Sequence, residues 1–164
     1  MSATPARFDE VLQANGPGLH AYLARRLGPS DAGDALGEVY ATAWRRRSRL
    51  PADDTEARMW LYGVAANVVR NLQRGQQRRR SLLDRMRQEA EVGTGDEGDL
   101  ADAVRDAIDR LPPAQAELVR LRHWEGFTLQ EAATVLGIPA STARTRYATA
   151  RQQLRHLLTA LTPY

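Results

Sequence analysis

The sequence predicts an all-α protein made of two small helical domains joined by a flexible acidic linker. Ala and Leu dominate its hydrophobic residues, β-branched residues are sparse and only 6% of the residues are aromatic, which favours helices over strands. Apolar residues recur every three or four positions in several segments, as in amphipathic helices. A length of 164 residues fits one domain or two small ones.

The charges divide the chain into three parts. All 23 basic residues are arginine, against 20 acidic residues. Residues 1–87 contain 15 Arg and 9 acids, residues 88–102 contain 6 acids and no Arg, and residues 103–164 contain 8 Arg and 5 acids. The middle segment has too little apolar surface to order itself, so we expect a flexible linker between two basic domains. A solubilising spacer explains its acidity as well as a specific role does.

Three helices are predicted in the first domain. The earliest covers about residues 8–27, where Gly16-Pro17-Gly18 is expected to break or kink it. The second covers residues 31–47 and carries Asp34 and Glu38 one turn apart on its outer face.

The third helix is predicted from about residue 56 to beyond residue 74, after a charged loop over residues 45–54. Its polar side chains fall in one stripe, which we expect opposite the apolar face of Leu61, Val64 and Val68. Aromatic, amide and Arg groups together suit single-stranded nucleic acid, since bases stack on aromatic rings while Arg follows the backbone. For Trp60 alone, packing onto the core is an equally good explanation. The stripe contains Trp60, Asn67, Asn71, Arg74 and Arg78.

The second domain carries the pattern of a helix-turn-helix. One helix ends before Pro112-Pro113, and a second is expected to run on to Gly126. Thr128 and Glu131 have the spacing of a capping box and predict a short helix over residues 129–136, which ends at Gly137. A long amphipathic helix follows Pro139, so a short helix, a glycine turn and a longer helix succeed one another.

The long helix presents polar residues where a helix-turn-helix contacts base edges. With Ala143 at the centre of the buried face, Ser141, Thr145 and Thr149 point away from the core, while Arg144 and Arg146 flank them. Arg can bind guanine through two hydrogen bonds. Arg151 and Arg155 extend the positive flank toward phosphates. The alternative is a solvated Arg-rich helix in a small bundle.

In these motifs the chain resembles the extracytoplasmic-function (ECF, group IV) sigma factors of bacterial RNA polymerase, from about residue 8 to 158. Residues 31–40, DAGDALGEVY, are similar to the family's D-A-E-D-L-x-Q-E-x-F helix. Residues 60–67, WLYGVAAN, look like its W-L-Y-R-I-A-x-N helix. Residues 131–146, EAATVLGIPASTARTR, resemble its region 4 pattern E-I-A-x-x-L-G-I-P-x-G-T-V-K-S-R. The resemblance implies sigma region 2 in residues 1–87 and region 4 in residues 103–164.

The resemblance also implies partners and the residues that bind them. Asp34 and Glu38, with Leu36 and Tyr40 beside them, match the helix that docks on the β′ clamp helices of core polymerase, and the β flap is a second implied contact. An anti-sigma factor is the implied inhibitor. The linker matches an acidic segment that threads toward the polymerase active site. Gly37 stands where the family usually has Gln, a change that weakens the docking helix.

Promoter contacts are implied for both domains. Asn67 and the loop over residues 49–56 match elements that melt the minus-10 region and capture an extruded base. The minus-10 set is Trp60, Asn67, Arg70, Asn71, Arg74 and Arg78. The minus-35 set is Ser141, Thr142, Arg144, Thr145, Arg146 and Thr149, of which Thr142 matches a phosphate contact.

The function implied is promoter-specific transcription initiation, without catalytic residues, metal or cofactor. The absence of cysteine excludes thiolate metal sites, and the three histidines are far apart, although carboxylate-only Mg²⁺ binding stays open. The N-terminus has no signal-peptide core and no apolar stretch is long enough to span a bilayer, so we expect a cytoplasmic protein without membrane insertion.

Two alternatives come from other classes. A free-standing helix-turn-helix regulator would bind a duplex operator with residues 103–164 and would usually be a dimer. It gives no account of Asp34, Glu38 or the helix around Trp60. A Mg²⁺-dependent nucleotide hydrolase would need a denser set of acids on facing helices than this sequence has.

Overall fold

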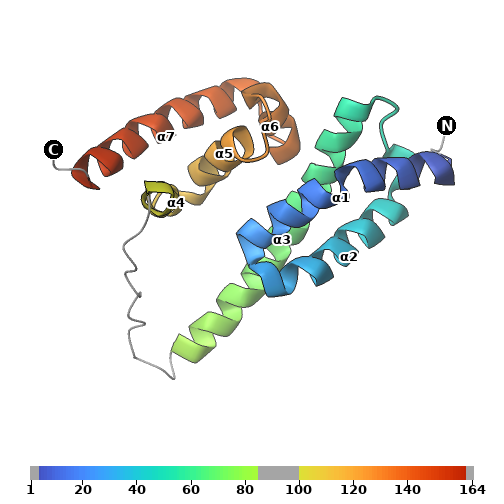
Figure 1. Cartoon of the computed structure of the whole chain (residues 1–164), viewed down its shortest axis with the longest axis horizontal. Helices are drawn as coiled ribbons and strands as arrows, with labels where there is room; N and C mark the ends of the chain where they lie inside the picture. The colour runs from blue at the N-terminus through green and yellow to red at the C-terminus, as the bar shows by residue number, and fades with distance from the viewer. Residues whose placement is uncertain (1–3, 85–99, 162–164) are drawn as a thin grey trace. The chain divides into compact units, whose positions relative to one another are not determined.

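The computed structural model describes residues 4–84 and 100–161, and every regular element in these ranges is a helix (Figure 1). The predicted all-α class is confirmed. The chain separates into two compact units, Met1–Gln88 and Glu89–Tyr164. In the described part of the chain, no helix has the length and apolar character that crossing a membrane requires.

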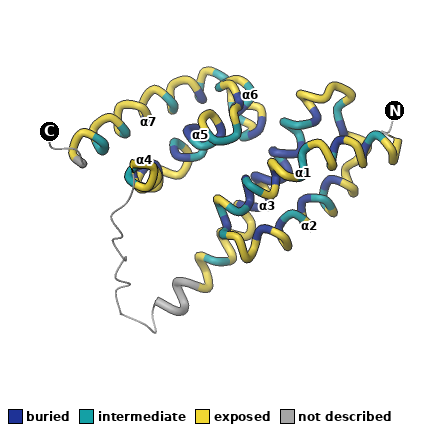
Figure 2. The backbone as a smooth tube through the Cα atoms, in the orientation of Figure 1, coloured by how far each residue is buried: buried dark blue, intermediate teal, exposed yellow. Residues whose placement is uncertain are grey.

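The first unit is built from three helices that all pack against one another, α1 (Pro5–Leu27), α2 (Pro29–Arg45) and α3 (Asp54–Asp84). A short 3₁₀ turn, η1 (Arg47–Arg49), lies within the predicted loop before α3. Buried residues recur along the sides on which the three helices meet (Figure 2). Burying such side chains is the main stabilising contribution to the unit. The largest fully buried ones are Tyr22, Leu19, Leu23, Leu61 and Val39.

Helix α1 runs through Gly16-Pro17-Gly18 as one helix, so the break predicted as one of two outcomes there does not occur. Pro17 lacks the N–H that would bond four residues back, but the residues after it are held by tertiary packing. Both glycines lie where tyrosines approach closely. A Cβ on Gly16 would lie 2.8 Å from the Tyr40 hydroxyl, and a Cβ on Gly18 would lie 2.6 Å from the Tyr62 hydroxyl. The segment is therefore a packing notch, a stretch of continuous helix where two missing side chains leave room for the two tyrosine hydroxyls.

We expect Gly18→Ala to lower stability although alanine favours helix. The new methyl group would overlap the Tyr62 hydroxyl, and Tyr62 is only 2% exposed and cannot move freely. Such overpacking costs about 1–3 kcal/mol. Gly33→Ala on α2 is the matched control, because a Cβ there meets nothing within 4 Å, and it should raise stability by ~0.5–1 kcal/mol. Urea denaturation of both variants tests this, and an increase in stability for both would contradict the notch.

The second unit contains α4 (Leu100–Asp109), α5 (Pro113–His123), α6 (Leu129–Leu136) and α7 (Ala140–Leu161). Helix α7 packs against all of the other three. One core cluster consists of the buried Ile108, Leu111, Ala116, Val119 and Ala150, against which Val104, Trp124, Tyr147, Leu154 and Leu157 pack.

The predicted capping box is confirmed. The Thr128 hydroxyl accepts from the Glu131 N–H at 3.1 Å, and Glu131 Oε1 accepts from the Thr128 N–H at 2.9 Å. Gly137 ends α6 in the left-handed conformation, with φ of 69°, which glycine adopts without strain. Gly137 therefore forms the turn between the short helix α6 and the long helix α7, as the predicted helix-turn-helix requires.

The predicted linker over residues 88–102 lies mostly outside the described residues. Helix α4 begins at Leu100, so residues 100–102, which were expected in the linker, are helical.

Candidate functional site

A groove of about 670 Å³ lies between α2 and α3 in the first unit. Helix α2 contributes an acidic wall of Asp31, Asp34 and Glu38, and α3 contributes Asn67 and Asn71. One hydrogen bond joins the two helices here, from Gln76 Nε2 to Asp31 Oδ2 at 3.3 Å. The groove thus brings together residues that the sequence assigned to two different partners.

The four predicted polymerase-binding residues occupy different surroundings. Asp34 and Glu38 are exposed and line the groove. Leu36 and Tyr40 are half-buried and are not part of its lining. Burial raises the pKa of Tyr40 above its ordinary value, so its hydroxyl is uncharged at neutral pH with or without the shift. Asp34 and Glu38 are therefore the two members of this set whose charges are accessible to a partner.

The predicted minus-10 residues divide in the same way. Asn67 and Asn71 line the groove, whereas the exposed Arg70, Arg74 and Arg78 do not. Trp60 is half-buried, so its exposure favours neither stacking with nucleic acid nor packing onto the core.

The predicted position of this stripe opposite the apolar face is wrong. Asn67 follows Val64 by three residues, which places the two about 60° apart around the helix, and Val64 and Val68 line the same groove. The amides therefore lie beside the apolar face, at the edge of the helix contact.

Sequence reasoning missed several groove residues near the C-terminal end of α2. Arg45 and Arg46 line the groove together with Thr42, yet the arginine run was interpreted only as a charged loop. Trp44 is also unexpected, because it is 44% exposed. Its ring contacts Phe8 edge-on, and the Arg47 guanidinium lies over the ring, 4.0 Å from its centroid. An arginine run directly after an aromatic residue was the available signal.

The predicted minus-35 residues lie on the first turns of α7. Ser141, Arg144, Thr145, Arg146 and Thr149 are exposed, and Thr142 is half-buried. The buried Ala143 and Ala150 fix which face is inward.

Two threonines on this face already use their hydroxyl protons. Thr145 Oγ1 donates to the Ser141 carbonyl at 3.0 Å, and Thr149 Oγ1 donates to the Thr145 carbonyl at 3.1 Å. In this arrangement each hydroxyl keeps only acceptor capacity for a further partner. The exposed Arg144 and Arg146 supply charged donors on this surface.

A polar contact joins α5 to α7 beside this surface. His123 Nε2 and the Tyr147 hydroxyl are 2.8 Å apart, and the two rings are stacked with centroids 6.0 Å apart. Burial lowers the pKa of His123 below its ordinary value of 6.5, and the positive charges of Arg122 and Arg151 lower it further.

We predict that Arg151→Gln raises the pKa of His123, because one repelling charge is removed. Since the folded pKa lies below the unfolded one, the stability linked to His123 is present above pH 6.5 and is lost as the pH falls through the folded value. NMR titration of the imidazole measures this pKa. Arg155→Gln is the control and should leave the value unchanged. A wild-type pKa at or above 6.5 would contradict the assignment.

Among residues 4–84 and 100–161, no group of three or more His, Asp or Glu side chains is placed to hold a metal ion. The acids of the groove lie on α2, and the α3 side supplies amides and Arg79. The facing acids that a Mg²⁺-dependent hydrolase needs do not occur in this groove.

Known protein families match both units. Residues 11–79 match sigma-70 region 2, and residues 101–154 match sigma-70 region 4. The chain is 29% identical over 162 residues to the RNA polymerase sigma factor NccH of Alcaligenes xylosoxydans xylosoxydans, across 92% of this chain and 86% of that protein. It is 29% identical over 164 residues to the ECF RNA polymerase sigma factor EcfG of Rhodopseudomonas palustris (strain TIE-1), across 96% and 88%.

Solved structures resemble the fold over most of the chain. The sigma factor RpoE of Bartonella quintana, solved in complex with the anti-sigma factor NepR, has a TM-score of 0.71 at 23% identity, covering 93% of this chain and 96% of that one. CnrH, solved in complex with the cytosolic domain of CnrY, has a TM-score of 0.67 at 24% identity, covering 98% and 92%. At these identities the likeness establishes the fold.

Proposed function

Because the chain belongs to the extracytoplasmic-function sigma factors of the sigma-70 family, we propose that it binds core RNA polymerase and directs transcription from specific promoters. It acts as a transcription regulator, and the chemistry of RNA synthesis belongs to the polymerase. Residues 1–87 bind core enzyme and the minus-10 element, residues 103–164 bind the minus-35 element, and residues 88–102 connect them. The protein works in the cytoplasm, where the polymerase is.

The single observation that carries this proposal is the groove between α2 and α3. Its two sides present exposed carboxylates of Asp34 and Glu38 and exposed amides of Asn67 and Asn71. Carboxylates suit a basic protein surface but repel phosphates, whereas amides can bond with unpaired bases. Two partners held side by side, polymerase on α2 and a DNA strand on α3, account for this combination.

The minus-35 contact rests on the exposed face of α7. A helix of this kind enters the major groove with its N-terminal residues against base edges. Arg144 is the residue we assign to base recognition, while Arg151 and Arg155 follow the phosphates. The internally bonded Thr145 and Thr149 offer a methyl group and an acceptor oxygen, which suit a thymine methyl and a base amino group.

An anti-sigma factor is the regulator we propose. The related RpoE was solved with the anti-sigma factor NepR, and CnrH with the cytosolic domain of CnrY. The similarity of this fold to both proteins supports an inhibitor that covers the polymerase- and DNA-binding faces.

Co-purification with core RNA polymerase, followed by run-off transcription from the promoter upstream of its own gene, tests the function. We expect a stable complex and transcripts that depend on this chain. Duplex DNA binding as a dimer, without any association with core enzyme, would favour a free-standing regulator and overturn the proposal.

Asn67→Ala should impair promoter opening more than promoter binding. The Asn67 amide is exposed and can supply hydrogen bonds to an unpaired base. Flipping a base costs a few kcal/mol that such contacts offset. Permanganate reactivity of unpaired thymines reports opening, and a mobility-shift assay at low temperature reports closed-complex binding. Equal losses in both assays would contradict the melting role.

A further inference from the structure

The loop between η1 and α3 is held by contacts at both of its ends. Leu50 is only 9% exposed and anchors the start. Asp53 anchors the end, because its Oδ2 accepts from the Glu56 N–H at 3.0 Å and so caps the first turn of α3. Between these anchors, Pro51 and Ala52 have no side-chain polar group with which to fix the backbone.

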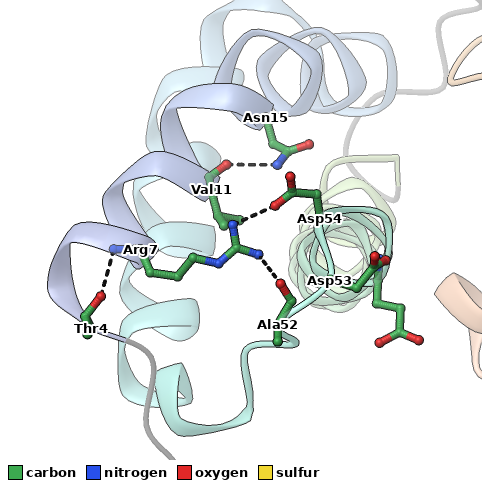
Figure 3. Close-up of polar contacts among 8 residues, drawn as sticks. Thr4, Arg7, Val11, Asn15, Ala52, Asp53 and Asp54 are labelled. Atoms are coloured by element: carbon green, nitrogen blue, oxygen red, sulfur yellow. Dashed lines mark hydrogen bonds and ion pairs between the residues drawn. The ribbon is translucent and has the colours of Figure 1, made fainter.

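Arg7, in the first turn of α1, fixes this part of the loop through its side chain (Figure 3). Its Nη1 donates to Asp54 Oδ1 at 2.6 Å, and its Nη2 donates to the Ala52 carbonyl at 2.8 Å. The backbone of Arg7 is itself fixed, since its N–H donates to the hydroxyl of the N-cap residue Thr4 at 3.2 Å. One guanidinium thus bridges the last loop residues and the first residue of α3.

The contacts of Arg7 are better suited to orienting the loop than to stabilising the unit. The Asp54 side chain is 88% exposed and that of Arg7 is 26% exposed, and ion pairs so open to water add little to the free energy of unfolding. A planar guanidinium that donates to two acceptors nevertheless restricts their direction, as a single ammonium donor does not. Removing Arg7 should therefore release the loop without unfolding the unit.

We propose that Arg7 is a positioning residue that holds the loop over residues 50–53 against the start of α3, in the shape needed to capture an unpaired promoter base. The inference rests on the proposed function and on the family resemblance, which implies that the loop over residues 49–56 takes part in base capture. It adds that a residue of α1, outside both the loop and the groove, controls how precisely the loop is positioned for this capture.

The test uses holoenzyme assembled with the full chain and four fork-junction DNAs that differ only at the captured base. We expect Arg7→Ala to reduce the preference among the four bases by about tenfold, while binding to duplex minus-35 DNA and the melting temperature stay close to wild type. Arg7→Lys should recover only part of the preference, because it supplies one donor direction in place of two.

A control and a double variant make the test specific. Arg105→Ala removes an arginine from a similarly exposed ion pair, with Asp102 at 3.5 Å in the second unit, and should leave base preference unchanged. Adding Asp54→Ala to Arg7→Ala should cause little further loss, because both belong to one contact.

The outcomes separate this inference from the function on which it rests. If wild-type holoenzyme opens its promoter and Arg7→Ala keeps the full base preference, the positioning role is wrong and the function stands. If the wild-type chain neither binds core enzyme nor opens a promoter, the proposed function itself fails. A large fall in the melting temperature of Arg7→Ala would show a structural role instead.

Discussion

Replacing Asp34 and Glu38 together by arginine is expected to weaken binding to core RNA polymerase by about a hundredfold or more. Both carboxylates are exposed along one wall of the α2–α3 groove, so the reversal should not disturb the core of the unit. Like charges brought together at an interface cost several kcal/mol, and ~2.7 kcal/mol already corresponds to a hundredfold change in affinity. Fluorescence-detected titration of labelled core enzyme measures the effect.

The matched control is Asp9→Arg with Glu10→Arg. It changes the net charge of the same unit by the same amount, and both residues are exposed on α1, away from the groove lining. We expect near-normal binding for the control and unchanged helix content for both variants by circular dichroism. Equal weakening by the two double variants would show a general charge effect and remove the docking assignment.

Arg144→Ala is expected to abolish much of the discrimination between minus-35 sequences. If the exposed guanidinium of Arg144 binds one guanine through two hydrogen bonds, its loss costs ~1–3 kcal/mol on the preferred sequence and little on others. Holoenzyme binding to promoters with each minus-35 base pair changed in turn measures this. The variant should become indifferent to one position and keep its preference at the rest.

Arg155→Ala on the same helix is the contrasting variant. Arg155 is exposed three turns further along α7, where we assign a phosphate contact. Its removal should weaken binding to every sequence alike and lower the salt dependence by about one counterion. A uniform loss for Arg144→Ala as well would contradict base recognition by that residue.

Local features were predictable because their causes lie within a few residues. The capping box of Thr128 and Glu131, the glycine turn at Gly137 and the bounds of α6 all follow from hydrogen bonds that span four positions or fewer. The exposure of Asp34 and Glu38 followed in the same way from helical periodicity around Val39.

The exceptions have tertiary causes. Gly16-Pro17-Gly18 has the composition of a helix break, yet α1 continues because the glycines make room for the hydroxyl groups of Tyr40 and Tyr62. Those tyrosines come from α2 and α3, and no property of residues 16–18 identifies them. Burial of α1 against two other helices outweighs the local preference.

The sequence by itself determined the helical class, the order of the helices, the helix-turn-helix and the family. Only the tertiary structure decided which of these surfaces meet. It placed Asn67 and Asn71 across one groove from Asp34 and Glu38, and it joined Arg7 to Asp54, which are 47 positions apart in the chain. Periodicity specifies which side of a helix is buried, but the angle and depth at which two helices pack depend on side chains from both. Contacts between distant residues are therefore set by packing.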